Sequence, residues 1–376
     1  MAEIYLENVS KVFGKGTVAV KNLTLKIEDK EVIAILGPSG CGKTTTLRII
    51  AGLEKPTSGR IYIGGKDVTD LPPKDRNIGM VFQFYAIYPG KTVYENIAFP
   101  LRCRGLSKSE IRREVMNIAD YLEITRILDK EAVACHPSEK QLTALARALV
   151  THPQALLLDE PLTVLDADTR ELMRVKLKQI IEKEGITCIY VTHDQKEGMS
   201  LGHRIAVMKD GELQQVDTPS RLLNNPINKF VAGFIGSPTM NFLNGEIIKK
   251  NNEYYVIFSF GSVKIGKMLE KCEHKISLGD EITIGIRPRD IVLYTKEVEN
   301  SVPGYVSGIE YFGDHMLIKI SLSSGDSVIC QTTPIKLKIN DFVSVILPEE
   351  KYFFFDKDGK NILFKEVEKN MHIMGE

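Results

Sequence analysis

The chain has 376 residues, enough for two or three domains of roughly 150 residues each. Its 49 basic and 49 acidic residues give a formal net charge of zero, which argues against a protein held to nucleic acid mainly by phosphate neutralisation. The hydrophobic fraction of 43% excludes global disorder. Residues 1–7 lack the basic and apolar regions of a secretory signal, so we expect a cytoplasmic protein with no nucleic-acid partner.

The first 36 residues predict a small antiparallel sheet and then a buried strand. Short runs of alternating apolar and polar residues fill residues 4–27, and residues 32–36 form a continuous apolar run. After a glycine-rich loop, residues 44–51 carry apolar side chains at helical spacing up to Gly52, which is typical of a helix C-terminus. Residues 32–52 are therefore predicted to form a strand, a loop and a helix, in that order.

The segment from about residue 89 to residue 150 is predicted to be mainly helical. Within it, Ser107 and Glu110 have the spacing of a capping box, and the apolar residues that follow lie on one helix face. We therefore expect a helical subdomain here.

Strands and helices alternate from residue 155 onward, which indicates a parallel sheet. An apolar run at 155–158 precedes a helical pattern at 172–181, and a second apolar run follows at 187–191. The pair Asp210-Gly211 between two apolar runs predicts a hairpin.

Beyond about residue 236 the sequence changes to short strands separated by glycine-containing turns, which predicts an all-β, barrel-like domain. We therefore divide the chain into an α/β domain over residues 1–235 and a β domain over residues 236–376.

Residues 37–44, GPSGCGKT, match the phosphate-loop pattern G-x-x-x-x-G-K-[ST] between a predicted strand and a predicted helix. Glycines let backbone N–H groups converge on phosphates, Lys43 adds a positive charge, and Thr44 offers a hydroxyl to Mg²⁺. The Cys41 thiol inside this loop is either reactive or simply packed. Our candidate nucleotide ligands here are Gly37, Pro38, Ser39, Gly40, Cys41, Gly42, Lys43, Thr44 and Thr45.

Two carboxylates, Asp159 and Glu160, directly follow the apolar run at 155–158. A buried strand delivers both to the edge of the sheet, where ligands bind in open α/β folds. We expect Asp159 to hold Mg²⁺ and Glu160 to polarise the attacking water.

These two motifs, with a helical insertion between them, resemble the ATPase subunits of ABC transporters, which have an α/β P-loop NTPase core with an antiparallel β subdomain and a helical subdomain. The resemblance implies four further roles. Phe13 stacks on adenine, Gln83 is the Q-loop glutamine near the metal, His193 is the switch histidine that acts with Glu160 in catalysis, and Asp166 belongs to the D-loop. ATP and Mg²⁺ are the implied cofactors.

The resemblance extends over nearly the whole chain. Residues 230–245, 285–288 and 311–313 resemble the linker and OB-like barrel of the carbohydrate-importer branch, such as maltose or glycerol-phosphate importer ATPases. This implies a regulatory, dimer-contacting β domain and a position on the inner face of the cell membrane. The implied partners are membrane permease subunits, received near residues 85–89, and indirectly a solute-binding protein.

The family's signature, Leu-Ser-Gly-Gly-Gln, is altered here: residues 135–139 read CHPSE. In the family this segment binds the ATP held by the opposite subunit. Pro137 has no N–H to give, and Glu139 places a carboxylate where phosphate oxygens arrive. Ser138 and Gln141 still have the spacing of a capping box, so we expect a helix to begin here. The D-loop is altered too, at residues 163–166, TVLD.

The motifs that serve the chain's own ATP are therefore intact, whereas those that serve a partner's ATP are not. We hypothesise an asymmetric pair in which a second ATPase subunit supplies an intact signature. A homodimer with weak or no turnover and an ATP-binding regulatory protein without transport coupling are the alternatives.

Overall fold

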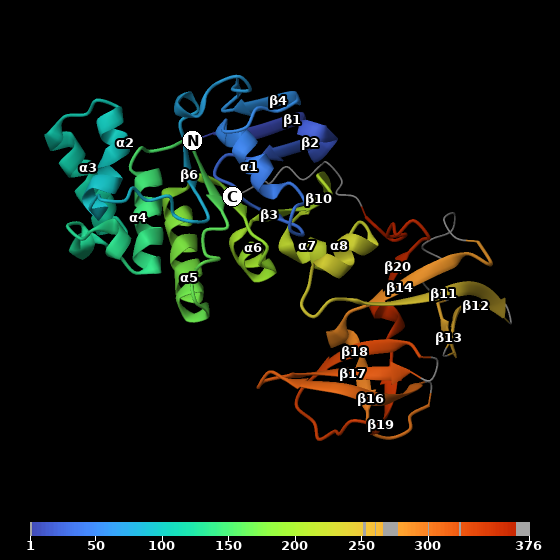
Figure 1. Cartoon of the computed structure of the whole chain (residues 1–376). Coiled ribbons are helices and arrows are strands. Elements are labelled where there is room, and N and C mark those ends of the chain that lie inside the picture. Colours follow the sequence, from blue (N-terminus) through green and yellow to red (C-terminus); the bar gives the residue numbers. More distant parts are fainter. Residues whose placement is uncertain are drawn as a thin grey trace, which may run out of the picture. The chain divides into compact units, whose positions relative to one another are not determined.

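The computed structural model describes residues 2–250, 253–259, 261–265, 277–299, 301–322 and 325–365. The chain forms two compact units, Met1–Pro219 and Ser220–Glu376 (Figure 1). The short helices α7 (Pro219–Asn224) and α8 (Lys229–Phe234), which our division assigned to the first domain, therefore fall almost wholly in the second unit. The Arg287 guanidinium explains this placement, because it donates hydrogen bonds to backbone carbonyls at the ends of both helices.

A six-stranded sheet in the order β10-β9-β3-β8-β7-β6 is the centre of the first unit. Its five strands from β9 to β6 are parallel, as the alternation of strands and helices predicted. β9 and β10 form the predicted hairpin, with Asp210 and Gly211 at positive φ in its turn. The bounds are β3 (Val32–Leu36), β6 (Ile78–Val81), β7 (Ala155–Asp159), β8 (Thr187–Val191), β9 (Arg204–Lys209) and β10 (Glu212–Asp217).

The predicted N-terminal antiparallel sheet is also present, in the order β2-β1-β4-β5. Its apolar side chains form one core with helix α1 (Lys43–Ala51) and with one face of the central sheet. Helix α1 ends at Gly52, whose positive φ and N–H bonds to Arg48 and Ile49 match the predicted terminus. The strands are β1 (Ile4–Phe13), β2 (Thr17–Ile27), β4 (Ser58–Ile63) and β5 (Lys66–Asp67).

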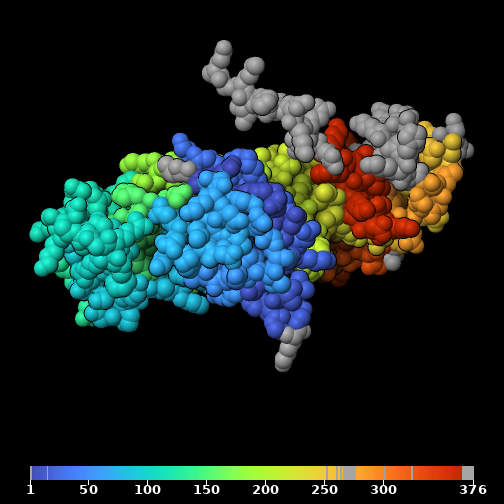
Figure 2. All heavy atoms as spheres, turned by 90° about the horizontal axis from the view of Figure 1, so that it is seen from above, coloured from blue at the N-terminus to red at the C-terminus, as the bar shows by residue number. Residues whose placement is uncertain are grey.

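The predicted helical segment contains α2 (Val93–Cys103), α3 (Lys108–Tyr121) and α4 (Pro137–Leu149), whose residues gather as a lobe of the first unit (Figure 2). The capping box at Ser107 and Glu110 is confirmed. The cap predicted for α4 was wrong: His136 and Glu139 form its capping box, two residues earlier than Ser138 and Gln141. Helices α5 (Ala167–Glu184) and α6 (Gln195–Leu201) complete the first unit.

Two five-stranded antiparallel sheets make up most of the second unit and share a core that includes Ile284, Ile318 and Val343. This confirms an all-β domain. The first sheet contains β11 (Asn241–Lys250), β12 (Glu253–Phe258), β13 (Gly261–Lys264), β14 (Glu281–Ile286) and β20 (Phe353–Phe355). The second contains β15 (Val292–Tyr294), β16 (Val302–Tyr311), β17 (Met316–Leu322), β18 (Ser327–Thr332) and β19 (Phe342–Ile346). The 3₁₀ turns η5 (Pro288–Asp290) and η6 (Glu349–Lys351) lie between strands.

Among the described residues, no helix is long and apolar enough to cross a membrane.

Candidate nucleotide-binding site

The loop between β3 and α1 has the backbone that a phosphate cradle requires. Gly40 and Gly42 adopt positive φ values of 78° and 103°. A Cβ atom on Gly42 would lie 2.3 Å from the carbonyl oxygen of Ala19, so this position has no room for a side chain. Because α1 begins at Lys43, its first backbone N–H groups have no partner within the helix and face the loop.

Lys43 places a buried ammonium group inside this loop. Its Nζ donates hydrogen bonds to the carbonyl oxygens of Gly37, at 2.8 Å, and Pro38, at 2.9 Å. The loop thus combines a fixed positive charge with open backbone donors at a helix N-terminus, a donor set that fits a phosphate group.

Cys41 is packed rather than exposed within the loop. Only 4% of its surface is accessible, and burial raises the pKa of its thiol. Both observations favour the packed alternative over a reactive thiol.

Asp159 and Thr44 meet at the end of β7. The Thr44 hydroxyl donates to Asp159 Oδ1 at 3.0 Å. Burial raises the pKa of the Asp159 carboxyl, the neighbouring Glu160 charge adds to this, and the bond from Thr44 opposes it. Two oxygen donors side by side, one of them a buried carboxylate, are the ligand type that Mg²⁺ prefers.

This pairing predicts the effect of removing the hydroxyl. We expect Thr44→Val to weaken ATP binding about tenfold or more in the presence of Mg²⁺, the size of effect seen when a metal site loses a supporting group. Thr44→Ser, which keeps the hydroxyl, should bind like the unchanged protein. Titration with ATP in Mg²⁺ and in EDTA measures the difference, and an unchanged affinity of Thr44→Val in Mg²⁺ would contradict the assignment.

Three polar side chains converge on the carboxylate of Glu160. Its Oε2 accepts a hydrogen bond from Gln83 Nε2 at 3.0 Å and one from the Thr163 hydroxyl at 3.4 Å, and His193 Nδ1 lies 3.2 Å away. Glu160 itself has a φ of 47°, which is unusual for a residue with a side chain and is typical of functional sites.

The sheet order explains why these residues meet. Gln83 follows β6, Glu160 follows β7 and His193 follows β8, and these three strands are adjacent and parallel. Their carboxyl ends therefore lie at one edge, where ligands bind in open α/β sheets. Gln83, expected near the metal, bonds Glu160 here and not the pair Thr44 and Asp159.

Phe13 lies apart from this cluster, at the end of β1. Its ring is partly exposed and lies under the Lys11 ammonium, 4.9 Å from the ring centroid. No hydrogen bond or ring contact among the described residues joins Phe13 to the phosphate loop, so its adenine-stacking role remains a prediction.

Our sequence analysis missed Arg147, which ties α4 to the segment after Gln83. Its guanidinium donates to the carbonyl oxygens of Ala86, at 2.7 Å, and Tyr85, at 3.0 Å. Both of these residues have positive φ. The sequence carries no local signal for this contact, since the partners are more than 60 positions from Arg147.

Glu197, also missed, supports the backbone on either side of His193. This carboxylate is only 3% exposed, and its Oε2 accepts hydrogen bonds from the Thr192 hydroxyl at 2.7 Å and the Tyr190 hydroxyl at 2.8 Å. The Thr192 hydroxyl in turn accepts a bond from the N–H of Asp194. A buried polar chain therefore holds the turn that carries His193.

Burial raises the pKa of Glu197, although the bonds from Thr192 and Tyr190 oppose the shift. A carboxyl with a raised pKa in the folded state binds its proton more tightly there, so its stabilising contribution is full at low pH and is lost as pH rises through the folded-state pKa. We expect Glu197→Gln, which cannot ionise, to lose stability less steeply as pH rises above 4.5. Urea unfolding at several pH values tests this, with the exposed Glu182→Gln as control, and equal slopes for both variants would contradict it.

The N-terminus of α4 is capped from within the chain. The backbone N–H of His136 donates to Glu139 Oε2 at 2.9 Å, and Lys130 Nζ donates to the same atom at 3.0 Å. Pro137 is the first helical residue. The end of the helix that would face an anion is thus partly occupied by the protein's own carboxylate.

Residues 20–163 match the ABC transporter family, residues 236–291 match the MalK OB fold domain and residues 284–355 match the TOBE domain. The trehalose/maltose import ATP-binding protein MalK of Thermococcus litoralis is 41% identical over 97% of this chain and 100% of its own length. The chain belongs to the ABC transporter ATP-binding proteins.

Other members of the family agree over most of their lengths. The oligosaccharides import ATP-binding protein MsmX of Bacillus subtilis is 38% identical over 95% of this chain and 98% of its own. Among solved structures, the ATP-binding cassette MJ0796, a dimer bound to ADP and Pi, is 35% identical with a TM-score of 0.53, covering 57% of this chain and 98% of its own. The family confirms the α/β P-loop core and the C-terminal OB-like domain.

Proposed function

We propose that this chain binds and hydrolyses ATP to power the import of a sugar or a related solute. The cluster around Glu160 carries the proposal, because one carboxylate at the carboxyl edge of the sheet contacts an amide, a hydroxyl and an imidazole beside the phosphate loop. A carboxylate whose position is fixed by polar neighbours in this way can act as a general base, which orients and polarises a water molecule. The trehalose/maltose and oligosaccharide importer relatives support the solute class.

Each residue of the site then has a distinct role. Lys43 and the backbone N–H groups of the loop hold the phosphates, while Thr44 and Asp159 hold Mg²⁺, which neutralises phosphate charge when bound. His193, whose Nδ1 lies 3.2 Å from Glu160 Oε2, is proposed to contact the terminal phosphate, and Gln83 to connect the site to the helical segment. Phe13 completes the adenine site.

We further propose an asymmetric pair, in which a second ATPase subunit supplies the signature that completes this chain's site. The internally capped N-terminus of α4 supports this, because Glu139 and Pro137 stand where the signature offers donors to a partner's ATP. The Val164 side chain has no hydrogen-bonding group to offer across an interface, which also supports the asymmetric pair. A weakly active homodimer is the alternative that the dimerisation test distinguishes, and a regulatory ATP-binding protein without transport coupling is the alternative that the copurification test distinguishes.

The chain is proposed to act at the inner face of the cell membrane, bound to permease subunits and supplied indirectly by a solute-binding protein. The segment before α2 supports this surface, because the Phe84 side chain is 74% exposed and Arg147 fixes the backbone beside it. The β domain is proposed to regulate the ATPase and to contact its counterpart.

Copurification tests the permease contact. We expect a tagged chain, purified from detergent-solubilised membranes of the native cell, to retain permease subunits, and Phe84→Glu to lose them while still binding ATP. Leu172→Glu, another strongly exposed apolar position, is the matched control. If no permease subunit copurifies with the unchanged chain, the result would contradict a transport role.

A further inference from the structure

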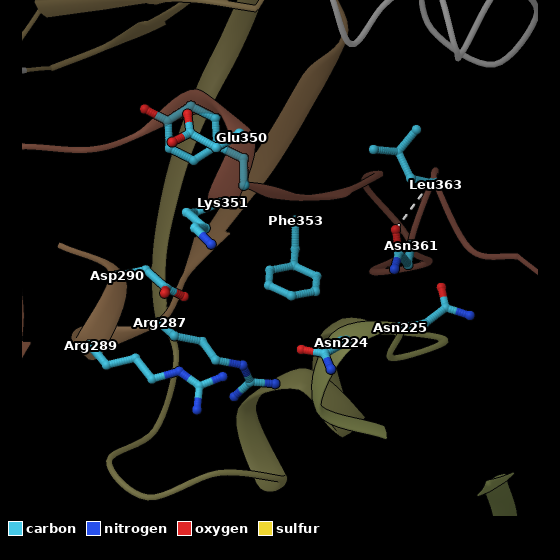
Figure 3. Close-up of a pocket in the computed structure, with 11 residues that line it drawn as sticks. Asn224, Asn225, Arg287, Arg289, Asp290, Glu350, Lys351, Phe353, Asn361 and Leu363 are labelled. Atoms are coloured by element: carbon cyan, nitrogen blue, oxygen red, sulfur yellow. Dashed lines mark hydrogen bonds between the residues drawn. The ribbon is translucent and has the colours of Figure 1, made fainter. Parts of the chain in front are cut away.

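The second unit contains a pocket that the proposed ATPase activity does not use. It has a volume of about 290 Å³ and is lined by residues from α7, η5, η6 and β20 (Figure 3). This volume is near the lower end of the range of about 300–1,000 Å³ that small-molecule sites occupy. A pocket of this size suits a small metabolite and not a polymer.

Arg287 lines the pocket, and two hydrogen bonds hold its guanidinium in place. The residue is 4% exposed, and its Nη1 and Nη2 donate to the carbonyl oxygens of Ile235, at 3.0 Å, and Leu223, at 2.6 Å. Its Nε has no hydrogen-bond partner in the described part of the chain. Burial, and to a smaller extent the positive charge of Arg289, lower the pKa of Arg287 to about 10, although Asp290 opposes the shift. The guanidinium of Arg287 therefore donates its hydrogen bonds to neutral carbonyl oxygens and not to a carboxylate.

Two more cations, Arg289 and Lys351, line the same pocket and are exposed to solvent. Figure 3 shows them, with Arg287, on one side of the Phe353 ring, and the Asp290 carboxylate lies among them. Asp290 and Glu350 also line the pocket, yet within the described ranges no carboxylate lies within 4.0 Å of any of the three cations. The pocket therefore gathers positive charge without ion pairs of its own.

The neutral part of the lining suits a hydroxylated ring. Asn224 is exposed, its Nδ2 makes only a long 3.4 Å bond to the Ser220 hydroxyl, and its Oδ1 has no partner among the residues described. Phe353 adds an aromatic ring to the lining, and the Arg287 guanidinium lies 5.6 Å from the centroid of that ring. Amide groups and aromatic rings are the side chains that fix the hydroxyls and the apolar face of a small polar ligand.

We propose that this pocket binds a phosphorylated sugar, with the phosphate at Arg289 and Lys351 and the sugar ring between Phe353 and Asn224. A phosphate group is favoured over a carboxylate because its two negative charges and three acceptor oxygens can meet both of the exposed cations that line the pocket.

Calorimetric titration of the full chain tests this site. Excess Mg-ADP is present throughout, so that the phosphate loop is occupied. We expect glucose 6-phosphate to bind, and the double variant Arg289→Gln/Lys351→Gln to lose at least tenfold in affinity. Lys336→Gln, an exposed lysine of the same unit outside the pocket, should bind as the unchanged chain does.

Two further probes define the ligand class. Glucose and inorganic phosphate should each bind at least tenfold more weakly than glucose 6-phosphate, since each lacks half of the contacts. The proposal is overturned by equal affinity for either probe, by full binding to the double variant, or by no binding of glucose 6-phosphate. None of these results bears on the ATPase site, which the nucleotide titrations test separately.

Discussion

Glu160→Gln is expected to lower steady-state ATP hydrolysis by about 100-fold or more while leaving ATP bound. The amide has nearly the shape of the carboxylate and can still meet Gln83 and His193, but it cannot polarise a water molecule as a base. General bases of this kind contribute about 10²–10⁴-fold to a rate. Phosphate release measures hydrolysis, and equilibrium dialysis with labelled ATP measures binding. Hydrolysis is to be assayed with the copurified partners present.

Two controls separate the chemistry from the fold. Glu182→Gln removes an exposed carboxylate from α5 and should hydrolyse ATP normally. Lys43→Ala removes the loop ammonium and should lose ATP binding as well as hydrolysis. Undiminished hydrolysis by Glu160→Gln would remove this residue from the catalytic role.

Restoring the signature is expected to convert a monomer into an ATP-dependent dimer. We predict that Glu160→Gln alone stays monomeric in Mg-ATP, and that adding His136→Ser, Pro137→Gly, Ser138→Gly and Glu139→Gln produces a dimer. The four changes supply a hydroxyl and open backbone N–H groups, and they remove the carboxylate that now occupies the N-terminus of α4. Size-exclusion chromatography with light scattering, with and without Mg-ATP, measures the mass.

The outcomes separate the alternatives for this chain. A dimer formed by Glu160→Gln without the four changes would favour the homodimer, because the altered segment would then still hold phosphate. Adding Lys43→Ala to the restored chain should abolish the dimer, which shows that ATP bridges the subunits. Thermal unfolding of the restored chain checks that the loss of Pro137 and of the Lys130–Glu139 ion pair has not melted the helix.

Local patterns in the sequence were sufficient for much of the fold. The phosphate loop, the end of α1 at Gly52 and the hairpin at Asp210-Gly211 each depend on glycines in conformations that few other residues adopt, so the sequence marks them directly. The continuous apolar runs of β3, β7 and β8 likewise identified strands buried on both faces. The choice of residues at the cap of α4 failed, because two overlapping boxes have the same spacing and the Lys130 contact favours Glu139.

Contacts between distant residues were decided only by the tertiary structure. The sequence identified Gln83, Glu160 and His193 separately. The order of β6, β7 and β8 in the sheet is what brings the side chains of Gln83 and His193 to the Glu160 carboxylate. Arg147 and Glu197 have partners set by packing, and the second unit's pocket joins residues more than 100 positions apart. Periodicity and spacing report the bonds a segment makes with itself, whereas the partner of a buried charge depends on which strands and helices pack beside it.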